Sequence, residues 1–180
     1  MSKVYIGIDI GKQGSFAIMK EGVITTFPMP MIKTELDYSG LCNLLTDAIS
    51  TDAFGSTVIA HVIFEKLGVI FGSSKQTAFS MGNQAGAVEM ACICQNIPYT
   101  KVNAKDWQKA MFQGVEEILR APKPGSKTGK GSRDTKAMAL VAVKRIFPKQ
   151  KLTFGEKATK PHDGLIDAVL MTEYARRNNL

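Results

Sequence analysis

A carboxylate interrupts the first apolar stretch of this chain, and its placement restricts how the chain can fold. Residues 3–10 alternate in character, which predicts a β-strand with one apolar row made up of Val4, Ile6, Ile8 and Ile10. Asp9 stands between the last two of these residues. Because burying an unpaired carboxylate is costly, Asp9 needs a hydrogen-bond donor, a lysine or a metal ion as its partner.

Short apolar segments separated by turns predict the rest of the sheet. Segments 15–19 and 23–27 follow the first strand after tight turns, which predicts an antiparallel meander. Residues 57–64 form a nearly continuous, β-branched apolar run, typical of a parallel strand covered on both faces, and 97–102 forms a further strand. Apolar residues at helical spacing predict helices at 38–49, 76–95, 104–112, 132–146 and 161–177.

These elements predict an α/β fold. Its mixed five-stranded sheet should contain three antiparallel strands followed by two parallel ones, with helices on both faces. The length of 180 residues suits a single domain spanning residues 1–180. Gly, Pro, Ser and Lys dominate residues 121–133, which predicts a flexible basic loop within that domain.

Composition narrows the class of protein. The net charge of +7 favours a polyanionic partner, with nucleic acid the first candidate. No apolar run reaches the length of a membrane span, so we expect no membrane association. The three cysteines suggest no disulfide framework; we expect them to be small buried hydrophobic residues of a protein in the reducing cytoplasm.

A second acidic residue ends the buried strand at 57–64. Glu65 follows this strand, at the position where ligand-binding crevices form in α/β sheets. The alternative is that Glu65 merely begins the next loop and is solvated there beside Lys66.

The last predicted helix carries two further acids. Asp163 and Asp167 are four residues apart and share one face of the helix, where like charges repel unless something lies between them. Asp163 has an ordinary explanation, because an acid in the first turn, marked here by Pro161, complements the helix dipole. Asp167 lies in an otherwise apolar turn and needs a partner.

The four carboxylates suggest a metal centre. Oxygen ligands of this kind suit Mg²⁺, with Mn²⁺ as a possible substitute, rather than zinc. Four negative charges balance two divalent cations, which predicts a two-metal site that activates water to attack a phosphodiester. The predicted ligands are Asp9, Glu65, Asp163 and Asp167.

With these residues in place, the chain resembles the RuvC-like Holliday junction resolvases of the RNase H-like superfamily, and most closely the variants carried by phages. GIDIGKQGSFAIM resembles the family's first strand and hairpin, and VIFEK resembles the strand that ends in its second ligand. Residues 71–112 resemble the following loop, long helix and strand, and HDGLIDAVLMTEYARR resembles the final helix. The resemblance implies a Mg²⁺-dependent crossover junction endodeoxyribonuclease of bacterial or phage-infected cytoplasm, with the four acids as its catalytic residues.

The sequence departs from the family pattern at one place. The family commonly spaces its final acids three residues apart, and Gly164 stands at that position here. A four-residue spacing keeps the same helical face, so we favour Asp163 as the ligand. His162 or a water molecule is the alternative at that corner, although a histidine beside a helix start is more often a capping or surface residue.

The resemblance also implies a homodimer, because a two-fold dimer can cut two equivalent strands of a four-way junction symmetrically. The candidate interface is the helix at 76–95, whose small residues Gly82, Gly86 and Ala87 allow another helix to approach closely. The alternative is that these small residues pack against the chain's own sheet.

DNA contacts are expected from basic residues and a Gly-Ser turn. The lysines of 121–133 suit phosphate contacts, although a solvated charged loop is the alternative. Phe71 or a neighbour could wedge into the junction, and Trp107 is interpreted as a core residue. The predicted DNA-binding residues are Gly72, Ser73, Ser74, Lys75, Lys109, Lys123, Lys127, Lys130 and Arg133.

We therefore expect a nuclease that resolves four-way or other branched DNA by paired symmetric cuts. An actin-like or sugar-kinase-like ATPase shares the strand–Asp–Gly–turn–strand pattern of GIDIGKQGS, but needs about twice the length and a second nucleotide loop. A non-catalytic branched-DNA-binding module is the other alternative, and the presence of all four acids argues against it.

Overall fold

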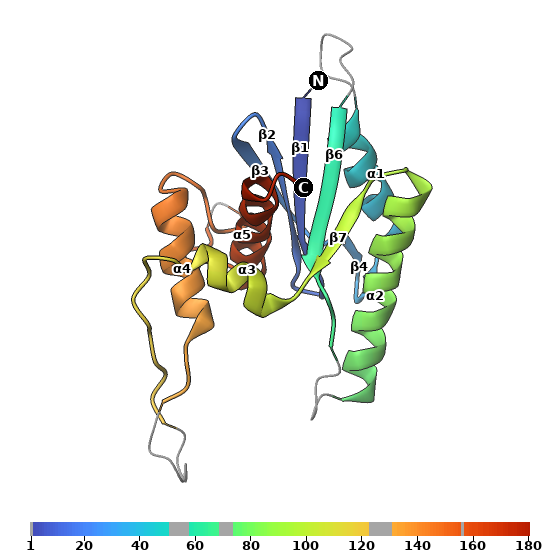
Figure 1. Cartoon of the computed structure of the whole chain (residues 1–180). Coiled ribbons are helices and arrows are strands. Elements are labelled where there is room, and N and C mark those ends of the chain that lie inside the picture. Colours follow the sequence, from blue (N-terminus) through green and yellow to red (C-terminus); the bar gives the residue numbers. More distant parts are fainter. Residues whose placement is uncertain (1, 51–57, 69–73, 123–130, 156) are drawn as a thin grey trace.

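The computed structural model describes residues 2–50, 58–68, 74–122, 131–155 and 157–180. Within them, a sheet of five strands runs in the order β3-β2-β1-β6-β7, with β1 at its centre (Figure 1). The strands are β1 (Ser2–Asp9), β2 (Ser15–Lys20), β3 (Val23–Pro28), β6 (Val58–Glu65) and β7 (Tyr99–Val102).

Strand directions agree with the sequence prediction. β1, β2 and β3 form an antiparallel meander, whereas β6 and β7 extend the other side of β1 in parallel. A hairpin of β4 (Met31–Ile32) and β5 (Glu35–Leu36) forms a second, two-stranded sheet. That hairpin was not predicted, because strands of two residues carry no measurable alternation.

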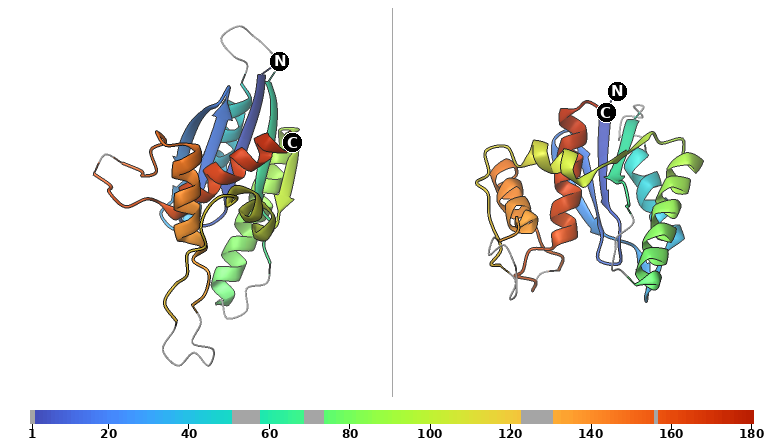
Figure 2. Two further views of the ribbon diagram at one scale, coloured as in Figure 1. Left: turned by 60° about the vertical axis from the view of Figure 1, so that its left-hand side comes forward. Right: turned by 60° about the horizontal axis from the view of Figure 1, so that its bottom comes forward.

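The described helices cover both faces of the sheet (Figure 2). α1 (Tyr38–Ile49) and α2 (Lys75–Cys94) lie on one face. The other face carries α3 (Ala104–Met111), α4 (Thr135–Ile146) and α5 (Asp163–Arg177). The predicted helices are confirmed, with starts and ends displaced by at most a few residues.

Two apolar layers, one on each face of the sheet, form the core. The predicted apolar row of β1, from Val4 to Ile10, packs in the layer beneath α1 and α2. Tyr5 and Met19 belong to the opposite layer, with residues of α3, α4 and α5. Because side chains alternate along a strand, Asp9 shares its face with Tyr5 and is directed toward α5.

Gly7 lets α5 lie close against β1. A Cβ atom at this position would collide with the carbonyl oxygen of Ala168 and the hydroxyl of Thr172. The Thr172 hydroxyl donates to the carbonyl oxygen of Ala168, 2.8 Å away, and also lies 3.1 Å from that of Ala17 in β2. This close approach fixes the position of α5 across the centre of the sheet.

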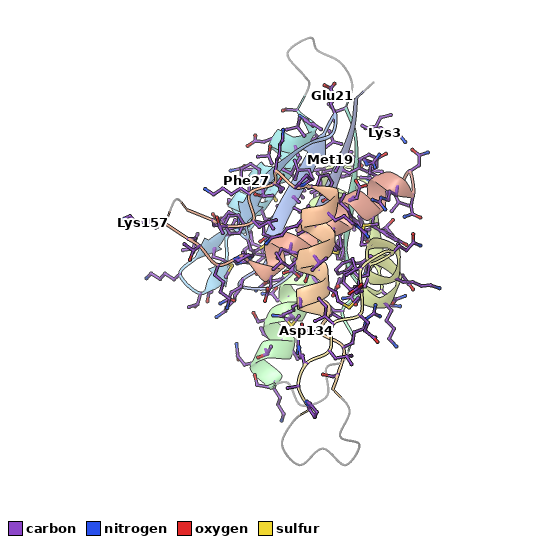
Figure 3. The ribbon with its side chains drawn as sticks, turned by 90° about the vertical axis from the view of Figure 1, so that its left-hand side faces the viewer. Lys3, Met19, Glu21, Phe27, Asp134 and Lys157 are labelled. Carbon is purple, nitrogen blue, oxygen red and sulfur yellow. The ribbon has the colours of Figure 1, made fainter. Side chains whose placement is uncertain are left out.

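The residues just before α4 pair with residues 118–120, earlier in the same segment. Asp134 lies at the start of α4 (Figure 3). It caps the helix, since its side chain accepts from the backbone N–H of Ala137 at 3.1 Å. The backbone N–H of Asp134 donates to Ile118 at 2.7 Å, and Leu119 forms a β-bridge with Arg133. The predicted flexible loop at 121–133 is thus joined at its base, while residues 123–130 lie outside the described part.

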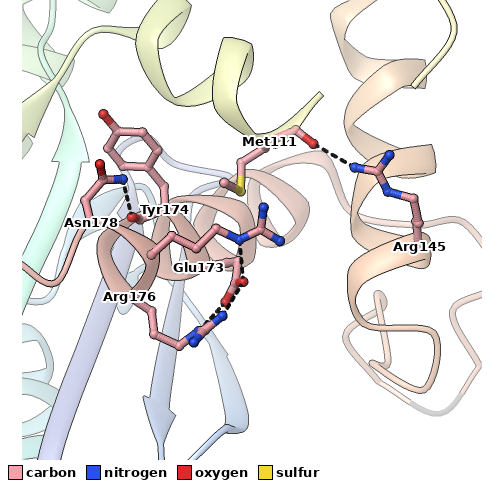
Figure 4. Close-up of polar contacts among 7 residues, drawn as sticks. Met111, Arg145, Glu173, Tyr174, Arg176 and Asn178 are labelled. Atoms are coloured by element: carbon pink, nitrogen blue, oxygen red, sulfur yellow. Dashed lines mark hydrogen bonds and ion pairs between the residues drawn. The ribbon is translucent and has the colours of Figure 1, made fainter. Parts of the chain in front are cut away.

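The far end of α5 shows how this protein pairs a buried carboxylate. Glu173 is buried and accepts hydrogen bonds from Arg176 and Arg177 at 2.7–2.8 Å (Figure 4). In the same region Arg145 of α4 donates to the carbonyl oxygen of Met111 at 3.3 Å, which ties α4 to α3.

One expectation about cysteines was wrong. Cys92 is buried in the α1–α2 layer, but Cys42 and Cys94 are exposed, because they occupy the outer faces of their helices. Within the described residues, no helix combines the length and hydrophobicity required to cross a bilayer.

Candidate active site

The structure brings the four predicted acids to one end of the sheet. Asp9 ends β1 and Glu65 ends β6, and these strands are parallel neighbours paired through Ile8 and Phe64. Asp163 and Asp167 lie in the first turns of α5, which crosses β1. The charges of the other three acids all raise the pKa of Asp9, as expected for carboxylates gathered in one region.

Gly164 forms the closest approach between α5 and Asp9. A Cβ atom added to Gly164 would lie 2.5 Å from Oδ2 of Asp9 and 2.5 Å from the backbone oxygen of Gln13. There is therefore no room for a side chain at the position where the family pattern has an acid. Asp163 and Asp167 flank Gly164 in the sequence and are the acids of α5 that can act beside Asp9.

Asp9 and Asp167 are half-buried carboxylates with raised pKa values. Burial is the largest cause in both, and neighbouring carboxylates add to it, so the pKa rises to about 8 for Asp9 and about 7 for Asp167. No hydrogen bond or ion pair joins either carboxylate to another described residue. Glu173 is the contrast, because two arginines pair with it and its pKa is lowered despite burial.

Lys136 is the site residue that the sequence analysis missed. Its Nζ lies 2.5 Å from Oδ2 of Asp163, and its positive charge opposes the rise in the pKa of Asp9 and of Asp167. A lysine in the first turn of α4 gives no signal in the sequence. Only the packing of α4 on α5 brings it to the acids.

Glu65 has a specific partner, contrary to the alternative of a solvated loop residue. Its Oε1 accepts a hydrogen bond from Nε1 of Trp107 at 2.7 Å. Trp107 is fully buried, which confirms its interpretation as a core residue, and its indole N–H also holds the Glu65 side chain on the α5 side of the sheet.

His162 behaves as a helix cap. Its Nδ1 accepts from the backbone N–H of Leu165 at 3.2 Å, and its ring packs edge-on against Phe154 with centroids 5.0 Å apart. The nitrogen used for capping is not free to bind a metal.

These residues surround a hollow of about 470 Å³, which we call the acid cleft. Asp9, Asp163 and Asp167 line it from one side, together with the β1–β2 turn, while Lys136 and Lys160 add positive charge. Glu65 is not among its lining residues. The cleft can therefore admit an anionic group beside these carboxylates, provided that cations offset their charge.

The donor set fits divalent cations of the magnesium kind. All four acids offer oxygen, and Ser15, paired with Asp9 across β1 and β2, has a fully buried hydroxyl without a hydrogen-bond partner in the described part. Among the described residues, however, no three His, Cys, Asp or Glu side chains are gathered tightly enough to form a ready-made metal site. Lys136 engages only Oδ2 of Asp163 and Trp107 only Oε1 of Glu65, so the second oxygen of each carboxylate is left for a cation.

The predicted DNA-binding residues are only partly described. Gly72, Ser73, Lys123, Lys127 and Lys130 lie outside the described residues, as does Phe71. Ser74, Lys75, Lys109 and Arg133 are exposed. The Ser74 hydroxyl caps α2 by accepting from the N–H of Thr77 at 3.0 Å, and the Arg133 guanidinium lies over the Phe112 ring at 5.7 Å.

The sheet order and helix placement are those of the RNase H-like fold. The structure of Thermus thermophilus RuvC is similar with a TM-score of 0.54 at 16% identity, covering 97% of this chain and 96% of that one. T. thermophilus RuvC in complex with a Holliday junction substrate gives 0.53 at 16% identity, covering 98% and 96%. The yeast mitochondrial Holliday junction resolvase Ydc2 gives 0.48 at 10% identity, covering 93% and 75%.

No family model matches the chain, and no curated protein matches it in sequence. The two RuvC structures confirm the resemblance expected from the sequence at the level of the fold, over nearly the whole length of both chains.

Proposed function

We propose that this protein is a metal-dependent, structure-selective endonuclease that cuts four-way or other branched DNA. The observation that carries the proposal is the pair of half-buried carboxylates of Asp9 and Asp167, which have no partner among the described residues, in a cleft that also contains lysines. Carboxylates that lack a protein partner in such a cleft are suited to binding cations. The similarity in fold to RuvC, one structure of which holds a Holliday junction substrate, supports branched DNA as the substrate class.

The four acids are the proposed ligands of two Mg²⁺ ions, or of Mn²⁺ in their place. When bound, such ions would supply Lewis-acid chemistry that activates the attacking water and stabilises the leaving oxygen. Asp9 and Asp167 are held rigidly, by β1 and by the close packing of α5. Glu65 and Asp163 are positioned by the polar contacts to Trp107 and Lys136, each through one oxygen, and would offer the other oxygen to a cation.

Lys136 and Lys160 are the proposed contacts to the phosphate at the cut, because both line the acid cleft. Further phosphate contacts are assigned to Ser74 and Lys75 at the start of α2, to Lys109 and Arg133, and to the residues of the Gly-Ser turn and basic loop that lie outside the described part. In Figure 1 the start of α2 and the described segments flanking 123–130 lie toward the end of the sheet where β1 ends.

A homodimer would allow paired symmetric cuts. The outer face of α2 suits this role, since Met90 and Ile93 are exposed and a Cβ at Gly82 or Gly86 would meet nothing within 4 Å. These glycines therefore do not pack against the chain's own sheet. Sedimentation of the protein and of Met90→Lys should show a dimer for the first and a shift toward monomer for the second.

The test is cleavage of a labelled synthetic four-way junction in Mg²⁺, with linear duplex, a flap substrate and ATP as controls. We expect symmetric cuts in two opposed strands of the junction and none in the duplex. Binding without cutting in either Mg²⁺ or Mn²⁺ would instead identify a binding module. ATP hydrolysis without DNA binding would identify an enzyme of the actin-like or sugar-kinase-like class.

A further inference from the structure

A second hollow adjoins the acid cleft at the β1–β2 turn. It has a volume of about 590 Å³ and lies among the first half of α2, the start of α1 and the β4–β5 hairpin. Gly11 lines both hollows, so they meet at this turn. We call the second hollow the Gln84 groove; the lining residues that matter here are Lys12, Tyr38, Phe79, Ser80, Asn83 and Gln84.

Gln84 lines this groove with a buried side-chain amide, one atom of which is unpaired. The residue is only 4% exposed, and its Nε2 donates to the Ser80 hydroxyl at 3.3 Å. Its Oε1 has no hydrogen-bond partner within the described residues. A buried amide oxygen left unpaired is unfavourable, so the groove is suited to a ligand that brings an N–H donor.

Aromatic surface lies beside this amide. Phe79 is 71% exposed although it is a large apolar side chain, and the neighbouring Tyr38 is half exposed, its hydroxyl bonded to Asn83 at 3.0 Å. A flat apolar ring offered to solvent next to a buried amide is the combination by which proteins hold an unpaired nucleobase, with stacking on the ring and hydrogen bonds to the base edge.

Charge links the groove to the cleft. Lys12 stands on the β1–β2 turn, exposed, and lines the Gln84 groove next to the point where the two hollows meet. A DNA strand with one phosphate in the acid cleft would pass this lysine, and the adjacent nucleotide would reach the groove.

We propose that the Gln84 groove binds one unpaired nucleobase of the strand whose phosphate occupies the acid cleft. That a DNA strand occupies the acid cleft rests on the proposed function. With the Gln84 side chain turned from Ser80 toward the groove, its Oε1 would accept from the exocyclic amine of adenine and its Nε2 would donate to N7, so adenine is the favoured base. Binding of this single nucleotide would thereby determine the position of the cut.

The test measures binding rather than cutting. Four-way junctions carry a single abasic site at each nucleotide around the exchange point in turn, and their affinities are measured by fluorescence anisotropy in Ca²⁺. For the wild type we expect one position at which the abasic site weakens binding about tenfold, and at which adenine binds best. Phe79→Ala and Gln84→Met should lose this sensitivity, whereas Val23→Ala, an exposed apolar residue of β3, should keep it.

The outcomes separate the two proposals. An abasic scan that is flat for the wild type overturns the groove, and so does a sensitivity that persists in both Phe79→Ala and Gln84→Met. Junctions that are cut despite a flat scan leave the nuclease standing without the groove. A position-dependent scan with no cutting in Mg²⁺ or Mn²⁺ supports the groove and contradicts the nuclease.

Discussion

A Cβ atom on Gly164 would lie 2.5 Å from Oδ2 of Asp9, so the backbone of α5 rests directly against the carboxylate that ends β1. Together with the close approach at Gly7, this contact fixes α5 at two points along the strand. The fixed helix delivers Asp167 to Asp9. The contact is possible because Gly164 has no side chain.

The first prediction concerns this contact. Gly164→Ala should lower the free energy of unfolding by about 2–4 kcal/mol, because the new methyl group must displace Asp9 and the backbone at Gln13. Gly82→Ala, in a helix but with open space around it, is the matched control and should gain up to about 1 kcal/mol. The free energies are measured by chemical unfolding of both variants. Equal stability of Gly164→Ala and wild type would contradict the contact.

The second prediction is a pH dependence of stability in EDTA. The pKa of Asp9 is about 8 in the folded protein but near 3.8 when the chain is unfolded, so between these values the folded state holds a proton that the unfolded state has lost. The free energy of unfolding should therefore fall as the pH rises from about 4 to about 8. Asp9→Asn should flatten this slope and add at least about 1 kcal/mol at pH 8.

Glu173 supplies the comparison of opposite sign. Its pKa is lowered by Arg176 and Arg177, so its charge stabilises the folded state above the ordinary carboxylate pKa, and this contribution is lost as the pH falls through the lowered value. Glu173→Gln should therefore weaken the protein at neutral pH. A slope between pH 4 and 8 that Asp9→Asn leaves unchanged would refute the assignment to Asp9.

The third prediction concerns Lys136. Lys136→Met removes both the partner of Asp163 and a positive charge of the acid cleft, so binding of a junction should weaken and the slope of log affinity against log salt should decrease by about 1. Lys144→Met, on the same helix and exposed, is the control. Salt titrations monitored by anisotropy provide the measurement, and equal slopes for the two variants would remove Lys136 from the DNA path.

The fourth prediction concerns the support of Glu65. Trp107→Phe keeps an aromatic ring in the core but removes the N–H that holds Glu65, and cutting should slow by about tenfold. Phe112→Leu alters the edge-on packing against Trp107, with ring centroids 6.1 Å apart, and leaves that hydrogen bond in place. Rates at saturating junction, compared after both variants are shown to be folded, should differ; equal rates would mean that packing alone matters.

Most of the fold could be predicted because the chain signals it locally. Alternation over β1, the continuous apolar run before Glu65 and the helical spacing of the remaining segments all agree with their burial. The β4–β5 hairpin is too short to show a period, and the exposed Cys42 and Cys94 follow from helix orientation rather than from residue type.

The candidate site was predictable only in part. Asp9 and Asp167 were identifiable because charges interrupt apolar runs, and their half-buried positions agree with that reasoning. Lys136 and the hydrogen bond of Trp107 to Glu65 were not, since they depend on how α4 and α3 pack against α5 and β6. Gly7 and Gly164 likewise owe their roles to backbone contacts that no sequence spacing reveals.

The central claim is that the acids at the start of α5 perform the chemistry. Its most direct measurement is the single-turnover cutting of a four-way junction in Mg²⁺ by Asp167→Asn, with Glu173→Gln as the control on the same helix. Both changes convert an acid of α5 to an amide. We predict that Asp167→Asn binds the junction but cuts at least about a thousandfold more slowly, while Glu173→Gln, where folded, cuts at the wild-type rate. Wild-type cutting by Asp167→Asn would contradict the account.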